Sequence, residues 1–282
     1  IQPEGFELNS SISSASTAFT NFVFYYEYDA RGRIIRKHIP AAGWTEIIYD
    51  KANRPVMIQD AYQKTLNRWN FIQYDVFGRE VVKGQTTKSI TRSSAQSSFD
   101  AHTVPYESRS GTTYSGASFP SSLQPAVTEK QLLNYYDDYT FLESQFAFNA
   151  TGAFHTQRPN IKGLIAGTKK RNSRDNSKLY TDAFYYDNLN RMIQSQHTHT
   201  LSSTNTSNIL IRNMEYNFAG EVVKKNSSFP FNTGTVTLKD KSEYDHAGRI
   251  TATSLGINAE PSDIIHYDYD EIGRLKQKKY LG

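Results

Sequence analysis

A seven-residue phrase recurs seven times along the chain and constrains the fold more than any other feature. Its last copy, YDEIGRL, runs from Tyr269 to Leu275. The copies begin at Tyr28, Tyr49, Tyr74, Tyr186, Tyr216, Tyr244 and Tyr269. Apart from one interval of 112 residues after Tyr74, the starts lie 21 to 30 residues apart. Such a period indicates a repeat architecture, in which each unit is too small to bury its own apolar face and stacks on its neighbours.

Composition alone does not produce this repetition. The chain has 19 Tyr in 282 residues, and about one Tyr-Asp dipeptide is expected by chance from the frequencies of the two residues. Eight occur, and six of them open copies of the phrase. The repetition is therefore not explained by the amino-acid composition.

The chemistry of the phrase is that of a tight turn. Asp favours the first position of a type I turn, and Gly or Asn three residues later enters the left-handed backbone region at least cost. A type I turn closed by such a residue is a common β-hairpin connection. The acids are Asp29, Asp50, Asp75, Asp187, Asp245 and Asp270, the third residues after the acid position are Gly32, Asn53, Gly78, Asn190, Gly220, Gly248 and Gly273, and the following arginines are Arg33, Arg54, Arg79, Arg191, Arg249 and Arg274. The copy at Tyr216 instead has Asn217 and Glu221.

The segments around the phrases predict an all-β fold, a curved antiparallel strip of β-hairpin repeats. The residue two before the Tyr is apolar or aromatic in six of the seven copies, as a half-buried strand requires, and 13% of the residues are aromatic. Seven hairpins make about fourteen strands, and open sheets of more than about ten strands curl. Residues 1–85 hold a lead-in, expected to become strand at Phe22, and three repeats.

Residues 86–126 are rich in Ser, Thr, Gly and Pro and are expected to be an insertion packed over the sheet, with a short helix near residues 89–99. Residues 127–282 hold degenerate strands and four further repeats, and the whole is expected to be one continuous repeat domain. Within it, residues 163–169 read as a strand, and residues 146–149 read as strand leading to a turn.

Composition excludes several function classes. Without Cys there are no disulfides, and no apolar run is long enough to span a membrane. The net charge is +4, but the basic residues are scattered, so no nucleic-acid partner is expected. The N-terminus has no secretory leader, which suggests either a removed leader or an internal fragment of a longer polypeptide.

No sequence motif predicts an enzyme, a metal or a cofactor. The repeated Asp residues are interpreted as turn acceptors rather than catalytic or calcium-binding groups, and the repeated Arg residues as stacking on Tyr or pairing with the turn Asp. His197 and His199 share one strand face, but no third metal ligand lies nearby in the sequence. The sequence therefore predicts a non-enzymatic chain.

A second interpretation is a carbohydrate-binding or adhesive module. Aromatic rings exposed on a sheet stack on sugar rings, although cross-strand packing explains most such rings. The candidates for glycan stacking are Tyr26, Trp44, Tyr185 and Tyr267.

The Tyr-Asp-x-x-Gly-Arg phrases and their spacing resemble the Rhs or YD-repeat family, over most of the chain outside residues 86–126. In the details of its sequence, including residues 163–169, the chain looks like the large Rhs-repeat proteins of Bacteroidetes. The resemblance implies a β-strip that spirals into a hollow shell of a secreted or cell-surface bacterial protein, in some members a polymorphic toxin. Its expected partners are the remaining shell and an enclosed C-terminal domain of the same polypeptide. The family's Asp-Pro-rich core motif is missing, so we expect an internal piece of shell wall that can also pair edge to edge as a homodimer.

Overall fold

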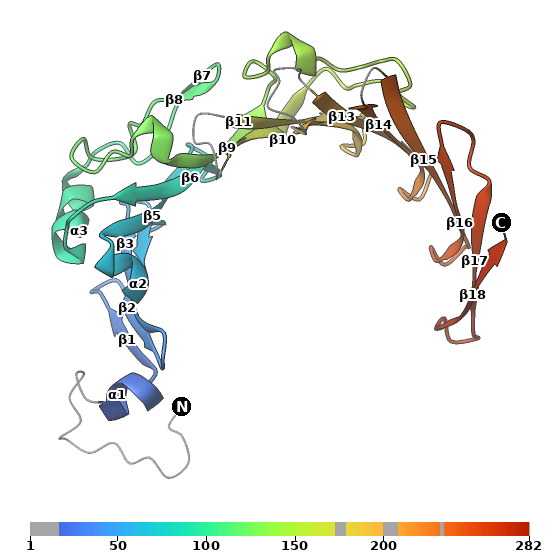
Figure 1. The fold of residues 1–282 in the computed structure, drawn as a ribbon. Helices are drawn as coiled ribbons and strands as arrows, with labels where there is room; N and C mark the ends of the chain where they lie inside the picture. The colour runs from blue at the N-terminus through green and yellow to red at the C-terminus, as the bar shows by residue number, and fades with distance from the viewer. Residues whose placement is uncertain (1–16, 173–178, 200–207, 232–233, 282) are drawn as a thin grey trace. The chain divides into compact units, whose positions relative to one another are not determined.

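The computed structural model describes residues 17–172, 179–199, 208–231 and 234–281 (Figure 1). The predicted all-β hairpin strip is confirmed. Sixteen strands form one open sheet in the order β1 to β6 and then β9 to β18. Fourteen of these strands flank the seven phrases, and the degenerate region contributes β9 and β10.

The elements of the first part of the chain are α1 (Thr17–Phe22), β1 (Tyr25–Tyr28), β2 (Ile34–Ile39), β3 (Gly43–Tyr49), β4 (Pro55–Gln59), α2 (Ala61–Thr65), β5 (Arg68–Tyr74), β6 (Glu80–Thr87), α3 (Arg92–Ala101), β7 (Arg109–Ser110), β8 (Thr113–Tyr114), η1 (Val127–Glu129) and β9 (Lys130–Asp137). Those that follow are η2 (Ser144–Phe146), β10 (Ile161–Arg171), β11 (Leu179–Tyr186), β12 (Met192–His199), β13 (Asn208–Tyr216), β14 (Val222–Phe231), β15 (Gly234–Tyr244), β16 (Ile250–Ile257), β17 (Asp263–Tyr269) and β18 (Leu275–Leu281).

Each phrase joins two antiparallel neighbours through the same irregular register. In the hairpin of β11 and β12, Tyr185 pairs with Gln194 but Tyr186 pairs with Met192, so one residue is bulged next to the turn. The same shift occurs in all seven hairpins. Because consecutive strands run in opposite directions, the turns formed by the phrases of one unit all lie along the same rim of its sheet.

The chain divides into two compact units, Ile1–Leu133 with Ser173–Ser177, and Asn134–Asn172 with Lys178–Gly282. In the first unit, the insertion folds over the sheet. Helix α3, near the predicted helix, places Phe99 against Phe119, which packs on Phe71 of β5. All three rings are buried. The Ser- and Thr-rich insertion is therefore an ordered cover of this unit.

A buried carboxylate fastens the insertion to the sheet. Glu107 is 3% exposed, and it accepts hydrogen bonds from the side chain of Gln73 at 2.8 Å and from the backbone of Gly116 at 2.5 Å. Both the backbone N–H and the hydroxyl of Ser118 also donate to it, at 3.0 and 2.5 Å. Buried charge is tolerated when hydrogen bonds surround it in this way.

In the second unit, residues 138–160 leave the sheet where the degenerate phrase at Tyr136 would have its turn. Phe146 of this segment packs with Ala183, Tyr185 and Ile193 in a buried cluster. The prediction of a strand around residues 146–149 is wrong. The alternating aromatic residues pack down onto the sheet instead of adding to its edge.

The lead-in also differs from the expectation. Residues 17–22 form helix α1, and the first strand begins at Tyr25 rather than at Phe22. Phe19 of the helix is buried against His38 and Trp44, with ring centroids 4.8 and 6.1 Å apart. The helical turn places this one ring on the sheet.

Candidate functional site: the rim of repeated turns

The turn aspartate divides its oxygens between backbone and side chain. In the turn of β11 and β12, Asp187 Oδ1 accepts from the backbone N–H groups of Leu189 and Arg191, each at 2.9 Å, and Oδ2 accepts from Arg191 Nε at 2.7 Å. Asn190 has φ of 64°, the left-handed region that Asn and Gly enter at least cost. Burial opposes ionisation of Asp187, but the hydrogen bonds from Arg191 outweigh it and hold its pKa below the ordinary value.

The other copies repeat this geometry. The Asp carboxylate accepts from both the backbone and Nε of the following Arg in the turns of Asp29, Asp50, Asp75, Asp245 and Asp270. The left-handed residues Gly32, Asn53, Gly78, Gly220, Gly248 and Gly273 have φ between 62° and 88°. These carboxylates act as turn acceptors and ion-pair partners.

The arginine of one turn also contacts the tyrosine of the next hairpin. The guanidinium carbon of Arg191 lies 4.8 Å from the centre of the Tyr216 ring, and the Tyr216 hydroxyl donates to the carbonyl of Met192 at 2.7 Å. The corresponding pairs are Arg33 with Tyr49 at 4.5 Å, Arg54 with Tyr74 at 4.6 Å and Arg249 with Tyr269 at 4.8 Å. We call each such Arg–Tyr contact a rim staple, because it ties one hairpin to the next.

Exposure shows which residues the staples cover. The Arg33 side chain is 16% exposed, whereas Arg274, which follows the last turn, is 76% exposed. At the other end, Tyr28 is 57% exposed. A turn residue is covered where a neighbouring repeat lies beside it.

The divergent copy keeps the turn with exchanged roles. The backbone N–H of Glu221 donates to Asn217 Oδ1 at 2.9 Å, and Asn217 Nδ2 donates to Glu221 Oε2 at 2.6 Å. Tyr244 still donates to the carbonyl of Val222 at 3.0 Å, although Glu221 stands where the other copies have their arginine. The hydroxyl bond is thus maintained without the cation.

The glycan-stacking candidates have different environments. Tyr185 is 2% exposed inside the core of the second unit, and its hydroxyl donates to the carbonyl of Phe146, so it offers no surface ring. Trp44 is half-buried, with Arg36 4.2 Å from its ring, and Tyr267 is half-buried beneath Lys278 at 5.2 Å. Tyr26 is 43% exposed.

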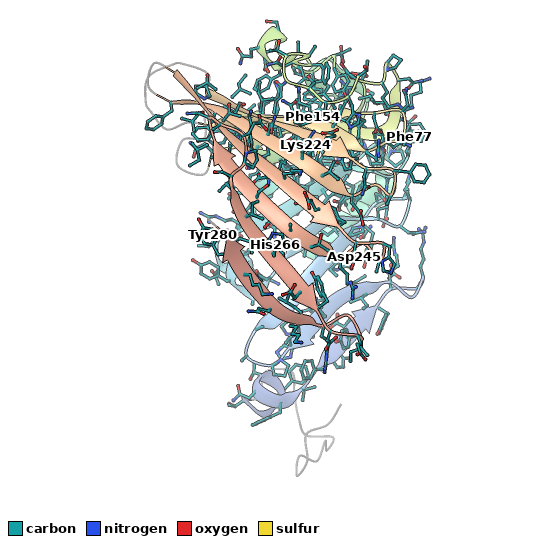
Figure 2. The ribbon with its side chains drawn as sticks, turned by 90° about the vertical axis from the view of Figure 1, so that its right-hand side faces the viewer. Phe77, Phe154, Lys224, Asp245, His266 and Tyr280 are labelled. Atoms are coloured by element: carbon teal, nitrogen blue, oxygen red, sulfur yellow. The ribbon has the colours of Figure 1, made fainter. Side chains whose placement is uncertain are left out.

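Side chains near the rim of the second unit carry cationic contacts as well. Figure 2 shows Lys224 beside Phe154, with Nζ 5.7 Å from the ring centre, and Asp245 at the turn of β15 and β16.

Across the ranges that the structure describes, no three His, Asp or Glu side chains are placed to bind a metal ion. In the same ranges, no helix is both long and apolar enough to cross a membrane.

One group of polar residues was not expected from the sequence. His197 lies opposite Asp182 in the register of β11 and β12, with Nδ1 2.9 Å from Asp182 Oδ1. Its other ring nitrogen, Nε2, lies 3.0 Å from Ser195 Oγ. The acid is 15 residues away in sequence, so only strand pairing brings it to the histidine. The side chain of His199, which the sequence places on the same strand face, lies outside the described residues.

Comparison with known proteins gives weak similarity. No protein-family model matches the chain, and no curated protein matches it. Among solved structures, the chain is similar to part of the TcdB2–TccC3 crystal structure, with 14% identity and a TM-score of 0.34. It is equally similar to the Tc holotoxin pore of Photorhabdus luminescens, with 14% identity and a TM-score of 0.34. In both cases 95% of this chain aligns, but it spans only 13% and 12% of those much longer chains, respectively.

Proposed function

We propose that the chain is a structural wall segment of a secreted or surface-displayed Rhs-repeat protein, and that this wall encloses or presents another polypeptide. The observation that supports this role is the row of rim staples, which joins hairpin to hairpin by the same two contacts in both units. The turn carboxylates accept hydrogen bonds from the backbone and the arginine of their own turns. The role therefore needs no catalytic group or cofactor.

The ends of the staple row support a longer wall. Tyr28 has no arginine beneath it, and Arg274 has no tyrosine above it, within the described residues. One more repeat on either side would supply each missing partner in the geometry of Arg191 and Tyr216. The proposed partners are thus further repeats of the same polypeptide and the chain that they surround.

A protease-protection experiment tests enclosure. The chain is produced together with the polypeptide encoded on both sides of it, and the flanking polypeptide is exposed to a broad-specificity protease. We expect protection in the parent protein and cleavage in the Asp187→Ala/Asp245→Ala variant, which opens two turns. Equal cleavage of both proteins, with the wall itself intact in the parent, would contradict enclosure.

A carbohydrate-binding module is the second candidate. The observation that favours it is a group of exposed aromatic residues around β1, comprising Phe22, Phe24, Tyr25, Tyr26 and Tyr28, each 43 to 57% exposed. Exposed aromatic rings on a strand can stack on sugar faces. Trp44 lies beside this group, 6.0 Å from the Tyr25 ring.

A glycan array distinguishes the two candidates. Binding that is lost in Tyr26→Ala and Trp44→Ala but kept in Tyr62→Ala supports the binding module, since Tyr62 is 73% exposed on α2 outside this group. Tyr267→Ala tests the remaining sequence candidate. No binding by the parent chain across the array favours the wall.

A further inference from the structure

The second unit carries an apolar groove on the face of its sheet. The groove has a volume of about 910 Å³ and extends across strands β11 to β16. Phe184, Leu210, Met214, Phe229 and Leu238 supply apolar walls. A concave, mainly apolar site with a few convergent polar groups is the usual form of a small-molecule binding site.

Ser195 and His197 are two of the polar residues that line this groove. They stand two residues apart on β12, so their side chains share one sheet face. Asp182 lies behind His197 on β11, and the chain of hydrogen bonds runs from Ser195 Oγ to His197 Nε2 at 3.0 Å and from His197 Nδ1 to Asp182 Oδ1 at 2.9 Å. The Phe184 ring lies against the imidazole at 6.2 Å.

The partners of Asp182 determine which nitrogen of His197 carries the proton. Thr168 Oγ1 and Lys170 Nζ each donate to Asp182 Oδ2 at 2.8 Å. Burial opposes ionisation of Asp182, but hydrogen bonds from His197, Lys170 and Thr168 lower its pKa to about 2. An ionised carboxylate only accepts, so Nδ1 of His197 must carry the proton that it donates.

In the imidazole tautomer that donates from Nδ1, Nε2 is the acceptor nitrogen, placed 3.0 Å from the Ser195 hydroxyl. A hydroxyl held by a base that a third group orients is the arrangement that activates a serine nucleophile. Ser195 is 3% exposed, and it lines the groove. Its access is therefore from the groove.

A cationic residue lines the same groove. Arg212 pairs with Ser195 in the register of β12 and β13, and it also lines the groove. A guanidinium on this face can stabilise the negative oxygen that develops when a carbonyl is attacked.

We propose that Ser195, His197 and Asp182 form an acyl-transfer site that hydrolyses esters whose apolar acyl group lies in the groove. Ser195 Oγ forms a bond to the acyl carbon as its proton passes to His197 Nε2. The same proton then goes to the departing alcohol oxygen as the ester bond breaks. Water attacks the acyl carbon and gives a proton to His197 Nε2; as the bond between the acyl carbon and Ser195 Oγ breaks, His197 passes this proton to Oγ, and the carboxylic acid leaves. No oxidant, metal or cofactor is needed.

This activity goes beyond the structural role and departs from the sequence-based expectation of a non-enzymatic chain. It depends only on residues of the second unit. Its failure would leave the wall proposal unchanged, because the protease-protection test does not involve the groove.

The direct test uses the full chain with p-nitrophenyl butyrate and, separately, a fluorophosphonate probe followed by peptide mass spectrometry. We expect turnover above the buffer rate and a probe adduct on Ser195. Ser195→Ala should lose both, and His197→Gln should lower turnover by about 100-fold or more, the usual contribution of a general base. Arg212→Gln should lower turnover by at least about tenfold with the Ser195 adduct still formed.

Matched controls are Ser254→Ala and His266→Gln, which lie on β16 and β17 and do not line the groove. Both should retain parent turnover. Circular dichroism and thermal melting of every variant separate loss of the site from loss of the fold. The proposal is overturned if folded Ser195→Ala keeps the parent turnover, or if the parent chain shows neither turnover nor adduct. The hydrogen bonds among Ser195, His197 and Asp182 would then serve only to satisfy buried polar groups.

Asp182 is a positioning residue, and its test needs a readout beyond stability. Asp182→Asn can donate to Nδ1 and so favour the wrong imidazole tautomer. We expect kcat to fall by about 100-fold or more with KM nearly unchanged. A proportional rise in KM with unchanged kcat would instead indicate a purely structural role in shaping the groove and would contradict the assignment.

Discussion

Asp187 shows how one carboxylate specifies a turn, because its two oxygens satisfy two backbone donors and one guanidinium. The divergent copy achieves the same closure with the amide of Asn217 and the carboxylate of Glu221. The turn therefore requires a paired acceptor and donor across four residues, and the order of the pair can be reversed.

The first prediction concerns replacing the Asp187–Arg191 pair by the Asn–Glu pair of the divergent copy. Asp187→Asn removes a charge-assisted hydrogen bond and should lower the free energy of unfolding by about 1 to 3 kcal/mol. Arg191→Glu should cost at least as much, because it places two acids together and removes the staple to Tyr216. The double variant recreates the Asn217–Glu221 pair and should recover part of the loss.

Chemical denaturation of the parent, both single variants and the double variant measures this coupling. Glu271→Gln, at an exposed turn position, serves as a control with a change within about 0.5 kcal/mol. Strict additivity of the two single changes would contradict the paired-turn explanation.

Asp182 provides the second prediction at this scale. Its folded pKa of about 2 lies below the ordinary value of 3.8, so the ionised form stabilises the fold at higher pH. That stabilisation is complete above about pH 4 and is lost as the pH falls toward about 2. Asp182→Asn should therefore be less stable than the parent near about pH 6, and the difference should shrink as the pH falls through this window.

Denaturation midpoints of both proteins, measured at intervals from about pH 6 to about pH 2, test this expectation. The turn aspartates lose stabilisation in the same direction, but they are present in both proteins and cancel in the difference. A difference that stays constant over this range would show that Asp182 is not preferentially ionised in the fold.

At the scale of elements, insertions decide which face of the sheet is buried. In the three copies at Tyr49, Tyr74 and Tyr186, the residue directly before the Tyr is buried: Ile48, Gln73 and Tyr185. The residues two before the Tyr, which the alternation emphasised, remain half-buried at Ile47, Ile72 and Phe184. The apolar pattern of a strand alone does not reveal a cover that comes from a distant segment.

Glu107 is the group on which the first cover depends, and its removal is the third prediction. Glu107→Ala leaves donors of Gln73, Gly116 and Ser118 without their acceptor in a buried place. We expect a loss of about 2 to 4 kcal/mol in the free energy of unfolding and faster proteolysis within residues 105–119.

Limited proteolysis with mass spectrometry locates the cleavage sites, and hydrogen exchange measures opening of the cover. The exposed Tyr62→Ala serves as the matched surface change in the same unit and should leave both unchanged. Wild-type protection of residues 105–119 in folded Glu107→Ala would show that the aromatic contacts of Phe119 hold the cover without the carboxylate.

At the scale of the whole molecule, the sheet formed by the described residues ends in two edge strands, β1 and β18. Unpaired edge strands pair with other chains unless charge or twist prevents it. β18 carries Lys276, Lys278 and Lys279, which oppose pairing with a second copy, but Lys279 is neutralised by Asp268 at 2.7 Å.

Self-association through this edge is the fourth prediction. The chain should form dimers as its concentration rises from about 10 to about 500 μM, measured by light scattering after size exclusion. Tyr280 is 66% exposed near the end of β18 (Figure 2), and Tyr280→Lys should weaken the association by adding charge to the edge. Phe218→Lys, at an exposed turn, removes an aromatic ring away from the edge and should have no effect. A parent chain that stays monomeric at every concentration would show that both edges are protected.

The sequence by itself determined the hairpins. Asp, a left-handed residue and Arg at fixed spacing dictate a local turn, and repetition of that turn places successive strands side by side. Tyr49 and Tyr216 could be assigned to strand ends, and stacking of Arg on Tyr could be expected, because turn chemistry acts over a few residues and the repeat carries it along the chain.

Only the tertiary structure decided what covers the sheet and which polar residues meet. The hydrogen bond from Tyr185 to Phe146 and the one from Gln73 to Glu107 join segments more than thirty residues apart. The pairing of Asp182 with His197 depends on the register of two strands, and a shift of one residue would turn their side chains to opposite faces. Local chemistry specifies a turn, but register and long-range packing arise from the free energy of the whole fold.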